Sequence, residues 1–186
     1  MPAPRDFATY TRDRFAALGL DLASETDIIE GRALAVRTVG PRVALAETLM
    51  RVQARTHCAC YVARSETGEL IGALSIIPLA PAAAPDLARG EFDGLAPADE
   101  QVARPGDRII ALYGWGMAGL TWRGRATVMA AAVALHRQIH PNLPLYGRAA
   151  TPGGRRTLLK RIGALPVPGQ GGLVMAPAWA AARQAA

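Results

Sequence analysis

The residues most suited to chemistry follow the most apolar run of the chain. Residues 108–118 (RIIALYGWGMA) form that run, and residues 122–127 (WRGRAT) come a few positions later. A strand that turns into the start of a helix leaves amide N–H groups directed outward, where the helix dipole favours an anion. Arg123 and Arg125 add two guanidinium groups that grip phosphate through paired hydrogen bonds. The pattern predicts an anion site at this turn, although a solvated basic turn accounts for the same residues equally well.

Cysteines and histidines are the other candidates for metal or redox chemistry. Cys58 and Cys60 form a Cys-x-Cys pair and, if their segment is a strand, point to one face of it. A zinc site needs further ligands at a second pair, and His136 and His140 lie far along the chain. We therefore expect two buried small side chains at the cysteines, a solvated helix face at the two histidines, and no metal site.

The elements that must position these residues can be predicted from apolar spacing and turn residues. In the first half we expect a helix over residues 5–18, a strand over residues 33–39, a helix over residues 42–55 and a hairpin over residues 58–64 and 69–77. Residues 78–107 contain five prolines. They are expected to form a long insertion loop, with one helical turn near residues 86–89.

The second half predicts alternating strands and helices. We expect a strand over residues 108–118, a turn over 119–126, a helix over 127–140, a strand over 145–150, a helix from Thr151 to Ile162, strands near 164–167 and 172–175, and a frayed tail at 180–186. Gly114 and Gly116 inside the first of these strands predict a bulge. A strand–helix–strand unit requires a parallel crossover, whereas the hairpin is antiparallel, so the sheet is expected to be mixed and the fold class α/β.

Composition limits the class of protein further. The chain has 186 residues, a net charge of +6 and 51% hydrophobic residues, which predicts one domain over residues 1–186 and excludes an acidic disordered chain. Residues 1–20 are expected to hold the N-terminal helix and show no secretory signal, so we expect a cytoplasmic protein without a membrane span. The arginines are scattered rather than clustered, so nucleic acid is not an expected partner.

Together, the Arg-Gly-Arg motif and the order of elements resemble the GNAT superfamily of N-acetyltransferases over about residues 30–175. Members carry Arg-Gly-Arg-Gly-Ile-Gly-type runs between a central strand and a helix, and that run binds the pyrophosphate of acetyl-CoA. The resemblance implies a GNAT-like fold and an acyl-CoA co-substrate. It places the pantetheine along Gly116, Met117 and Ala118 and the pyrophosphate on Arg123, Gly124, Arg125, Ala126, Thr127 and Val128.

Several positions depart from the family pattern. Ala126 and Val128 occupy the two glycine positions of the pyrophosphate loop, and Leu159 aligns with the tyrosine that often serves as general acid. A Cβ in the loop narrows the space for a ligand, because glycine allows the closest approach of backbone. The glutamate common on the central strand is absent from residues 112–115. Either other groups carry out catalysis, or the chain is a silent member of the fold.

Acyl transfer to an amine needs a base, an oxyanion donor and an acid for the departing thiolate. A backbone N–H near Met117 or Ala118 is the expected oxyanion donor, and Tyr113 is the predicted catalytic side chain. Tyr113 also fits a core aromatic. His57 and Tyr61 on the hairpin are further candidate bases, and each also fits an ordinary strand residue.

The predicted function is therefore transfer of an acyl group from acetyl-CoA or another acyl-CoA to a small-molecule or protein amine acceptor. One alternative is a transferase that takes its acyl group from acyl carrier protein, because the insertion before the central strand is similar to that of autoinducer synthases and toxin-activating acyltransferases. A basic surface suits an acidic carrier protein. The other alternative is a silent member that binds an acyl ligand or a protein.

Overall fold

A computed structural model describes residues 6–169 and 172–184. The helices are α1 (Phe7–Ala16), α2 (Glu25–Val39), α3 (Ala46–Thr56), α4 (Ala84–Arg89), α5 (Trp122–Ala134), α6 (Pro152–Thr157) and α7 (Trp179–Gln184). The strands are β1 (Asp21–Leu22), β2 (Cys60–Arg64), β3 (Leu70–Leu79), β4 (Ala111–Gly119), β5 (Leu145–Arg148), β6 (Leu165–Pro166) and β7 (Leu173–Ala176). Residues 1–5 and 185–186, which belong to the expected N-terminal helix region and tail, lie outside the described ranges.

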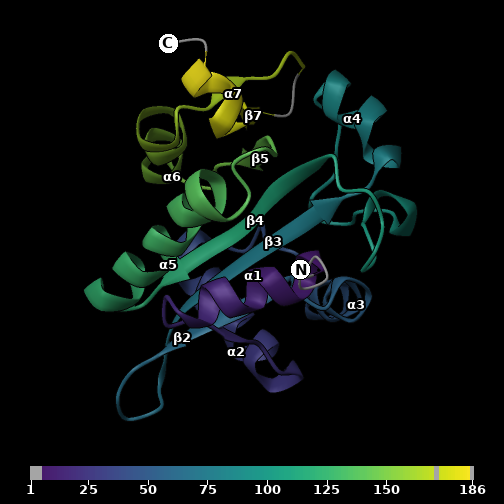
Figure 1. The fold of residues 1–186 in the computed structure, drawn as a ribbon. Helices are drawn as coiled ribbons and strands as arrows, with labels where there is room; N and C mark the ends of the chain where they lie inside the picture. The colour runs from purple at the N-terminus through teal and green to yellow at the C-terminus, as the bar shows by residue number, and fades with distance from the viewer. Residues whose placement is uncertain (1–5, 170–171, 185–186) are drawn as a thin grey trace, which may run out of the picture.

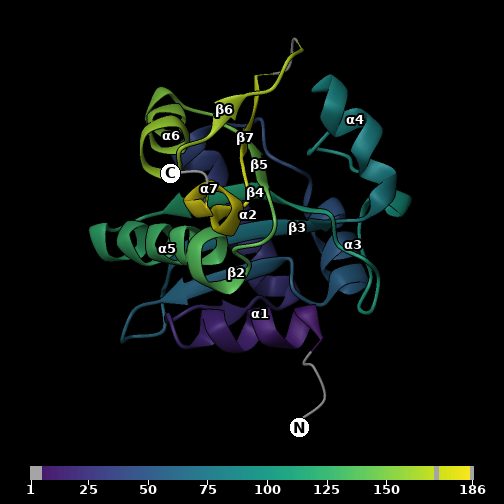
Figure 2. The same ribbon diagram turned by 45° about the horizontal axis from the view of Figure 1, so that its top comes forward.

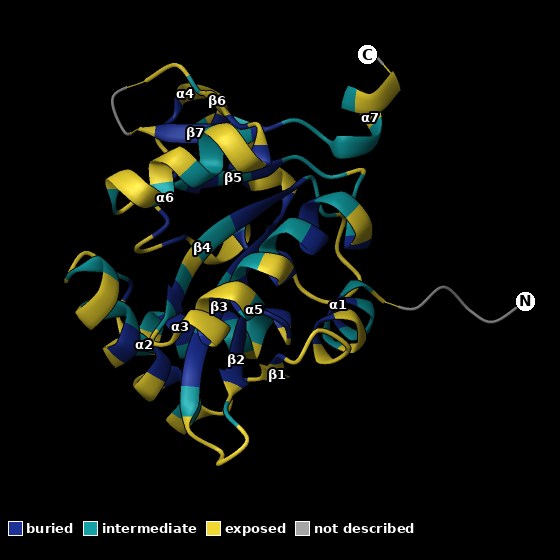
Figure 3. Ribbon diagram, turned by 90° about the vertical axis from the view of Figure 1, so that its left-hand side faces the viewer, coloured by how far each residue is buried: buried dark blue, intermediate teal, exposed yellow. Residues whose placement is uncertain are grey.

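The strands form one mixed sheet in the order β1-β2-β3-β4-β5-β7-β6. Only β4 and β5 are parallel, and the hairpin of β2 and β3 is antiparallel, as expected. Helices α1 and α5 pack on one face of the sheet, and α2 and α3 pack on the other (Figures 1 and 2). The buried residues follow the central strands, while the hairpin tip and the outer helix surfaces are exposed (Figure 3). The mixed α/β class predicted from the sequence is confirmed.

The expected strand over residues 33–39 is wrong, because this segment is the second half of α2. Ser24 and Asp27 cap one another at the start of this helix, each side chain bonding the other's backbone N–H. This reciprocal cap starts a helix that the alanines and Leu34 then continue. The β-branched residues at its end resemble a strand when they are considered without that cap.

Helix α5 begins at Trp122, so most of the turn expected over residues 119–126 is helical. Thr121 is the N-cap, and its hydroxyl accepts a hydrogen bond from the N–H of Gly124 at 3.0 Å. A threonine before a helix is a strong start signal, and Thr121 moves the helix start ahead of the predicted Thr127. The same signal at Thr151 predicts the next helix, which ends at Gly163 with a left-handed C-cap, as predicted.

The long connection over residues 78–107 is shorter and more ordered than expected. Strand β3 extends through Pro78 and Leu79, and α4 supplies the predicted helical turn. Arg148 on β5 fastens the segment to the sheet, because its guanidinium donates to the carbonyl oxygens of Gly90 and Phe92. The expected frayed tail is also wrong, since residues 179–184 form α7.

Both cysteines are free and buried, as expected. They do not share a face, because β2 begins only at Cys60 and Cys58 packs in the opposite core cluster. In the described ranges, no helix is long and apolar enough to cross a membrane, and no group of three or more His, Cys, Asp or Glu side chains is placed to hold a metal ion.

Candidate functional site

Strands β4 and β5 pair only at their beginnings. Three residue pairs join them, from Leu112 with Leu145 to Gly114 with Gly147. Directly after this point β4 carries a bulge, since Ser75 faces Gly116 and Ile76 faces Gly114, which leaves Trp115 unpaired. The bulge predicted from the two glycines is confirmed. Within residues 6–169 and 172–184, no strand pairs with β4 on its β5 side beyond Gly114.

The open side of β4 presents an unpaired backbone amide. Leu120 N–H donates to Ile71 O on β3, in register with the pair Ala118 and Ala73. Because hydrogen-bonding direction alternates along an antiparallel strand, Ala118 also bonds to β3 and the N–H of Met117 points to the other side. Of the two amides expected as the oxyanion donor, the N–H of Met117 is directed to the open side and that of Ala118 is bonded to β3.

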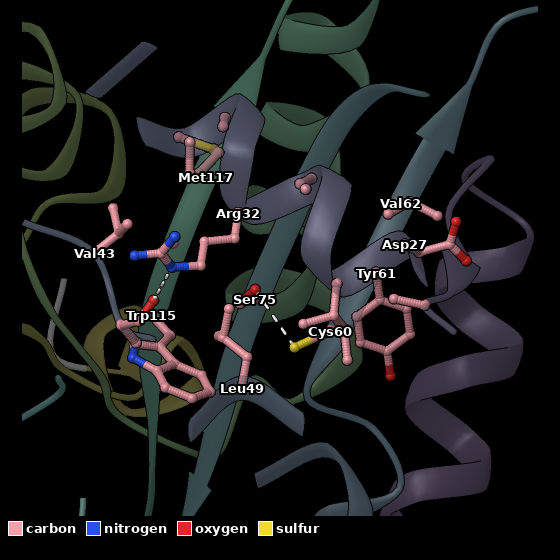
Figure 4. A pocket seen from close by; sticks show the side chains of 18 residues that line it. Asp27, Arg32, Val43, Leu49, Cys60, Tyr61, Val62, Ser75, Trp115 and Met117 are labelled. Atoms are coloured by element: carbon pink, nitrogen blue, oxygen red, sulfur yellow. Dashed lines mark hydrogen bonds between the residues drawn. The ribbon is translucent and has the colours of Figure 1, made fainter. Parts of the chain in front are cut away.

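Two cavities meet at this stretch. A cleft of ≈ 380 Å³ lies between the end of α2, the end of β4 and helices α5 and α6. It is lined by Thr38, Val39, Met117, Ala118, Gly119, Leu120, Arg125, Val128, Met129, Thr151, Gly154 and Thr157. A smaller cavity of ≈ 60 Å³ lies on the α2 face of the sheet, between α2 and strands β2 to β4 (Figure 4). Met117 and Ala118 line both cavities.

The predicted anion turn is the first turns of α5, so most of its amides are already bonded. Gly124 N–H is capped by the Thr121 hydroxyl, and Arg125 N–H donates to the Thr121 carbonyl oxygen at 3.0 Å. Later amides of the segment lie inside the helix. Only the N–H groups of Trp122 and Arg123 remain without a partner in the described part of the chain.

Gly124 allows α5 to pack closely on the sheet, and its predicted part in binding a ligand stays a prediction. A Cβ at this position would overlap the carbonyl oxygen of Ile71 on β3. Gly72 on β3 faces α5 in turn, since a Cβ at this position would lie 2.9 Å from Cγ1 of Val128. Glycines on both sides therefore allow α5 to lie directly on the backbone of the sheet.

The two arginines of the motif have different surroundings. Arg123 is largely exposed and forms an ion pair with Glu66 at the hairpin tip, at 2.8 Å. The hydrogen bond and charge of Arg123 lower the pKa of Glu66. Arg125 lines the cleft, where its guanidinium lies 3.4 Å from the carbonyl oxygen of Leu120. The structure thus brings Arg125 and Val128 to the cleft and leaves Arg123, Gly124, Ala126 and Thr127 outside both cavities.

Tyr113 lies away from the cavities. Its ring is buried against Phe92, with 5.0 Å between the ring centroids, and burial raises the pKa of its hydroxyl. It lines neither cavity. A catalytic role for Tyr113 stays a prediction.

Of the two hairpin candidates, Tyr61 lines the smaller cavity and His57 does not. His57 is exposed at the C-cap of α3, in the left-handed region with φ of 59°, and lines neither cavity. The ring of Tyr61 packs perpendicular to that of Phe15 on the α1 face, and its buried hydroxyl has no hydrogen-bond partner. Burial raises the pKa of Tyr61, so this hydroxyl stays protonated.

The solvated face expected at His136 and His140 is wrong, because terminal helices cover it. His136 is buried and bonds the carbonyl oxygen of Pro177, ahead of α7. His140 stacks on Phe7 of α1 and bonds the hydroxyl of Thr11 at 2.8 Å. These histidines therefore hold α1 and the start of α7 to the core.

Charge is divided between the two halves of the chain, which the net charge of +6 conceals. All 15 Asp and Glu residues precede residue 108, and residues 108–186 contain ten Lys and Arg residues and no acid. Most of the cleft belongs to this basic half. Arg155, Arg156, Lys160 and Arg161 are exposed on and after α6, which forms one side of the cleft. Counting charge by half would have predicted an anion-binding surface there.

One further motif was missed in the sequence. Gly114, Gly116 and Gly119 have the spacing Gly-x-Gly-x-x-Gly of the dinucleotide fingerprint. All three lie inside β4. The fingerprint needs its glycines in the turn between a strand and a helix, so this run does not form a dinucleotide site.

Comparisons with known proteins give similarity at the level of solved structures. No family model and no curated protein matches the chain. Among solved structures, the GNAT-like decarboxylase GphF in complex with isobutyryl-CoA is 22% identical, with a TM-score of 0.49 over 74% of this chain and 69% of that chain. A structure described as histone acetyltransferase HPA2 and related acetyltransferase, from Corynebacterium glutamicum, is 17% identical, with a TM-score of 0.49 over 86% and 96%. SsHAT is 15% identical, with a TM-score of 0.48 over 84% and 95%.

The fold itself is GNAT-like, as the sequence resemblance implied. The antiparallel strands β1 to β4, the bulge in β4, the parallel step through α5 to β5 and the parting of β4 from β5 are the features of that architecture. The assignment rests on this topology and on the element order, because the similarity to each solved structure is low.

Proposed function

We propose that this protein binds an acyl-CoA in the cleft beside α5 and α6 and transfers the acyl group to an amine held in the smaller cavity. The observation that supports this most directly is the meeting of the two cavities at Met117, whose backbone N–H is unpaired. An acyl donor in the cleft and an amine acceptor in the smaller cavity would meet at a single backbone amide, the N–H of Met117.

The cleft suits an extended anionic donor. The amide groups of a pantetheine arm can pair with the open side of β4 as an added strand would, starting at Met117. Its phosphates would then lie toward Arg125 and the basic half of the chain. The pyrophosphate is held less by the amides of residues 124–128, which the helix already uses, than by side chains and by the N–H groups of Trp122 and Arg123.

The chemistry needs few protein groups. The amine nitrogen attacks the thioester carbon, a C–N bond forms, and the negative charge on the carbonyl oxygen is stabilised by the N–H of Met117. Collapse of this intermediate breaks the C–S bond, and the thiolate takes up the proton that the amine loses. Asp27, the acidic residue that lines the smaller cavity, is engaged by Ser24 and Arg64. The proton is therefore expected to pass through water, so catalysis relies mainly on positioning and on the oxyanion donor.

Binding and transfer can be tested separately. Isothermal titration with acetyl-CoA should show saturable binding, and the absence of heat at 1 mM acetyl-CoA, on the order of the weakest KM values of enzymes, would overturn the proposal. A donor accepted only when loaded on acyl carrier protein would select the carrier-dependent alternative. Binding of acetyl-CoA without release of free thiol on any amine of a broad panel would identify a silent member of the fold.

Gly116 offers a sharp test of the acceptor side. It lines the smaller cavity, does not line the cleft, and has nothing within 4 Å of the position of a Cβ. In Gly116→Leu, the side chain should fill the cavity, lower the rate of transfer by about tenfold or more, and leave the Kd of acetyl-CoA unchanged. Gly116→Ala is the matched control and should retain activity. Equal activity in Gly116→Leu would show that the acceptor binds elsewhere.

A further inference from the structure

The smaller cavity contains a cation, Arg32, that forms no ion pair with a carboxylate of the described residues. Arg32 extends from α2 into this cavity, and its Nε donates to the carbonyl oxygen of Ala44 at 2.9 Å. Figure 4 shows the side chain passing Met117 and reaching toward Val43 and Trp115. The bond through Nε orients the guanidinium, and among the described residues its two terminal nitrogens have no hydrogen-bond partner, so they are available to a ligand.

No carboxylate of the described residues forms an ion pair with Arg32. Asp27 is the acidic residue that lines the same cavity, but it lies toward the other end (Figure 4). One oxygen of Asp27 accepts from Arg64 and the other accepts from Ser24. Burial alone would raise the pKa of Asp27, but the bonds from Ser24 and the charge of Arg64 outweigh it and lower that pKa. The carboxylate of Asp27 is therefore committed to holding α2 against β2.

The surroundings of Arg32 strengthen its attraction for an anion. Apolar side chains form most of the cavity wall, namely Ile28, Ala35, Val43, Leu49, Trp115 and Met117. A charge interacts more strongly in such surroundings than in water, because less solvent screens it. A guanidinium presents its terminal N–H groups as a planar fork that matches the two oxygens of a carboxylate.

We propose that Arg32 makes this cavity a carboxylate-binding site, so that the reacting substrate carries a carboxylate. This inference rests on the proposed function, because it assigns the substrate class of the same site. The volume of ≈ 60 Å³ suits a short aliphatic acid rather than a folded peptide. The carboxylate can belong to the amine acceptor, as in an amino acid, or to the far end of a dicarboxylic acyl group. Both place it on the same guanidinium.

The site is tested directly, without any acyl donor, by ligand-observed NMR with isovalerate and its neutral analogue isovaleramide. Isovalerate should bind the wild-type protein and isovaleramide should not. Arg32→Gln keeps an N–H donor for Ala44 but removes the charge, and it should abolish isovalerate binding. Arg37→Gln, on the exposed side of the same helix, is the matched control and should bind isovalerate as the wild type does. Equal binding of acid and amide, or unchanged binding in Arg32→Gln, would overturn the proposal.

A kinetic experiment distinguishes the two sources of the carboxylate. With acetyl-CoA as donor, Arg32→Gln should raise the KM of amino acids at least tenfold relative to their amides if the acceptor carries the carboxylate. If the acyl group carries it, Arg32→Gln should weaken succinyl-CoA relative to butyryl-CoA by a similar factor. Equal effects on the charged and neutral member of each pair would overturn the proposal. Failure of every CoA thioester to bind would refute the proposed function alone, because the NMR result does not depend on it.

Discussion

At the scale of single residues, Arg123 and Arg125 show what a motif can and cannot predict. Their types and spacing correctly indicate a basic segment at the start of a helix. Because the segment is helical, the side chain of Arg125 lies at the cleft, whereas that of Arg123 forms an ion pair with Glu66 at the hairpin tip. Residues two positions apart on a helix do not face the same way, so once the segment is helical the two arginines cannot share one phosphate.

We therefore predict that Arg125→Ala weakens acetyl-CoA binding by about tenfold, the effect of losing one charge-assisted contact. Arg123→Ala should change the Kd by less than about twofold, because its exposed ion pair contributes little. Isothermal titration of both variants measures the difference. A larger loss of acetyl-CoA affinity in Arg123→Ala than in Arg125→Ala would contradict this and support the anion site that the sequence predicts at the turn.

Tyr113 gives a second prediction at this scale. Its hydroxyl lies outside both cavities, beside Gly94 and the Arg148 anchor. Tyr113→Phe should keep kcat within about twofold of the wild type, since a residue outside the site supplies no proton-transfer factor of about 100 or more. Steady-state measurement of thiol release tests this. A hundredfold fall in kcat with normal stability would identify Tyr113 as the catalytic side chain that the sequence predicted.

At the scale of elements, glycine contacts explain where α5 begins and how close it lies to the sheet. A tight helix–sheet contact and a phosphate-binding loop both require glycine, so the sequence alone does not distinguish them at Gly124. The distinguishing neighbours, Ile71 and Gly72, lie more than fifty positions away in the chain. Such a contact cannot be inferred from local spacing.

The packing role of Gly124 predicts a loss of stability rather than of binding. Gly124→Ala should lower the free energy of unfolding by about 3 kcal/mol, because its Cβ overlaps backbone that cannot rotate away. Gly116→Ala should change it by less than about 1 kcal/mol, since open space surrounds that position. Urea unfolding of the two variants provides the comparison. A stable Gly124→Ala that no longer binds acetyl-CoA would indicate a ligand role instead.

Local signals predicted most of the other elements. The Ser65–Gly68 turn identified the hairpin, and Thr151 with Pro152 identified α6, because caps and turns depend on adjacent residues. The same physics would have found α2 from Ser24 and Asp27. The cavities could not be predicted, since each one is lined by side chains from at least three elements.

At the scale of the whole molecule, helices α1 and α7 both pack against the segment that follows α5. This segment, Leu135–Ile139, is a turn of π-helix. His136 within it contacts α7, and His140 at its C-cap contacts α1. Burial lowers the pKa of His140 to about 4. Docking of α1 therefore favours the neutral imidazole and should be sensitive to acid.

The sign of this effect follows from proton linkage. The unfolded chain takes up a proton at His140 below about pH 6.5, whereas the folded protein resists it down to about pH 4, so acid favours unfolding in this range. Stability should fall by less than about 1.4 kcal/mol per pH unit, because the side chain is only half-buried. Urea midpoints at pH 7 and pH 5 should differ less in His140→Gln than in the wild type. Identical differences would show that other groups govern the response to acid.

The extra residue at Trp115 has a consequence for comparing this chain with others. On β3, the residues facing α2 are Ala73, Ser75 and Ile77, all odd-numbered, whereas their partners on β4 are Ala118, Gly116 and Tyr113. The residues of β4 that face α2 are therefore odd-numbered before the bulge and even-numbered after it. A homologue lacking one residue here could keep Gly116 opposite Ser75 and Gly114 opposite Ile76, so the side chains on both sides of this point would keep their faces. What such a homologue would lose is the local bend and added twist of β4, so a one-residue gap at this point of an alignment marks a straighter central strand rather than an exchange of faces.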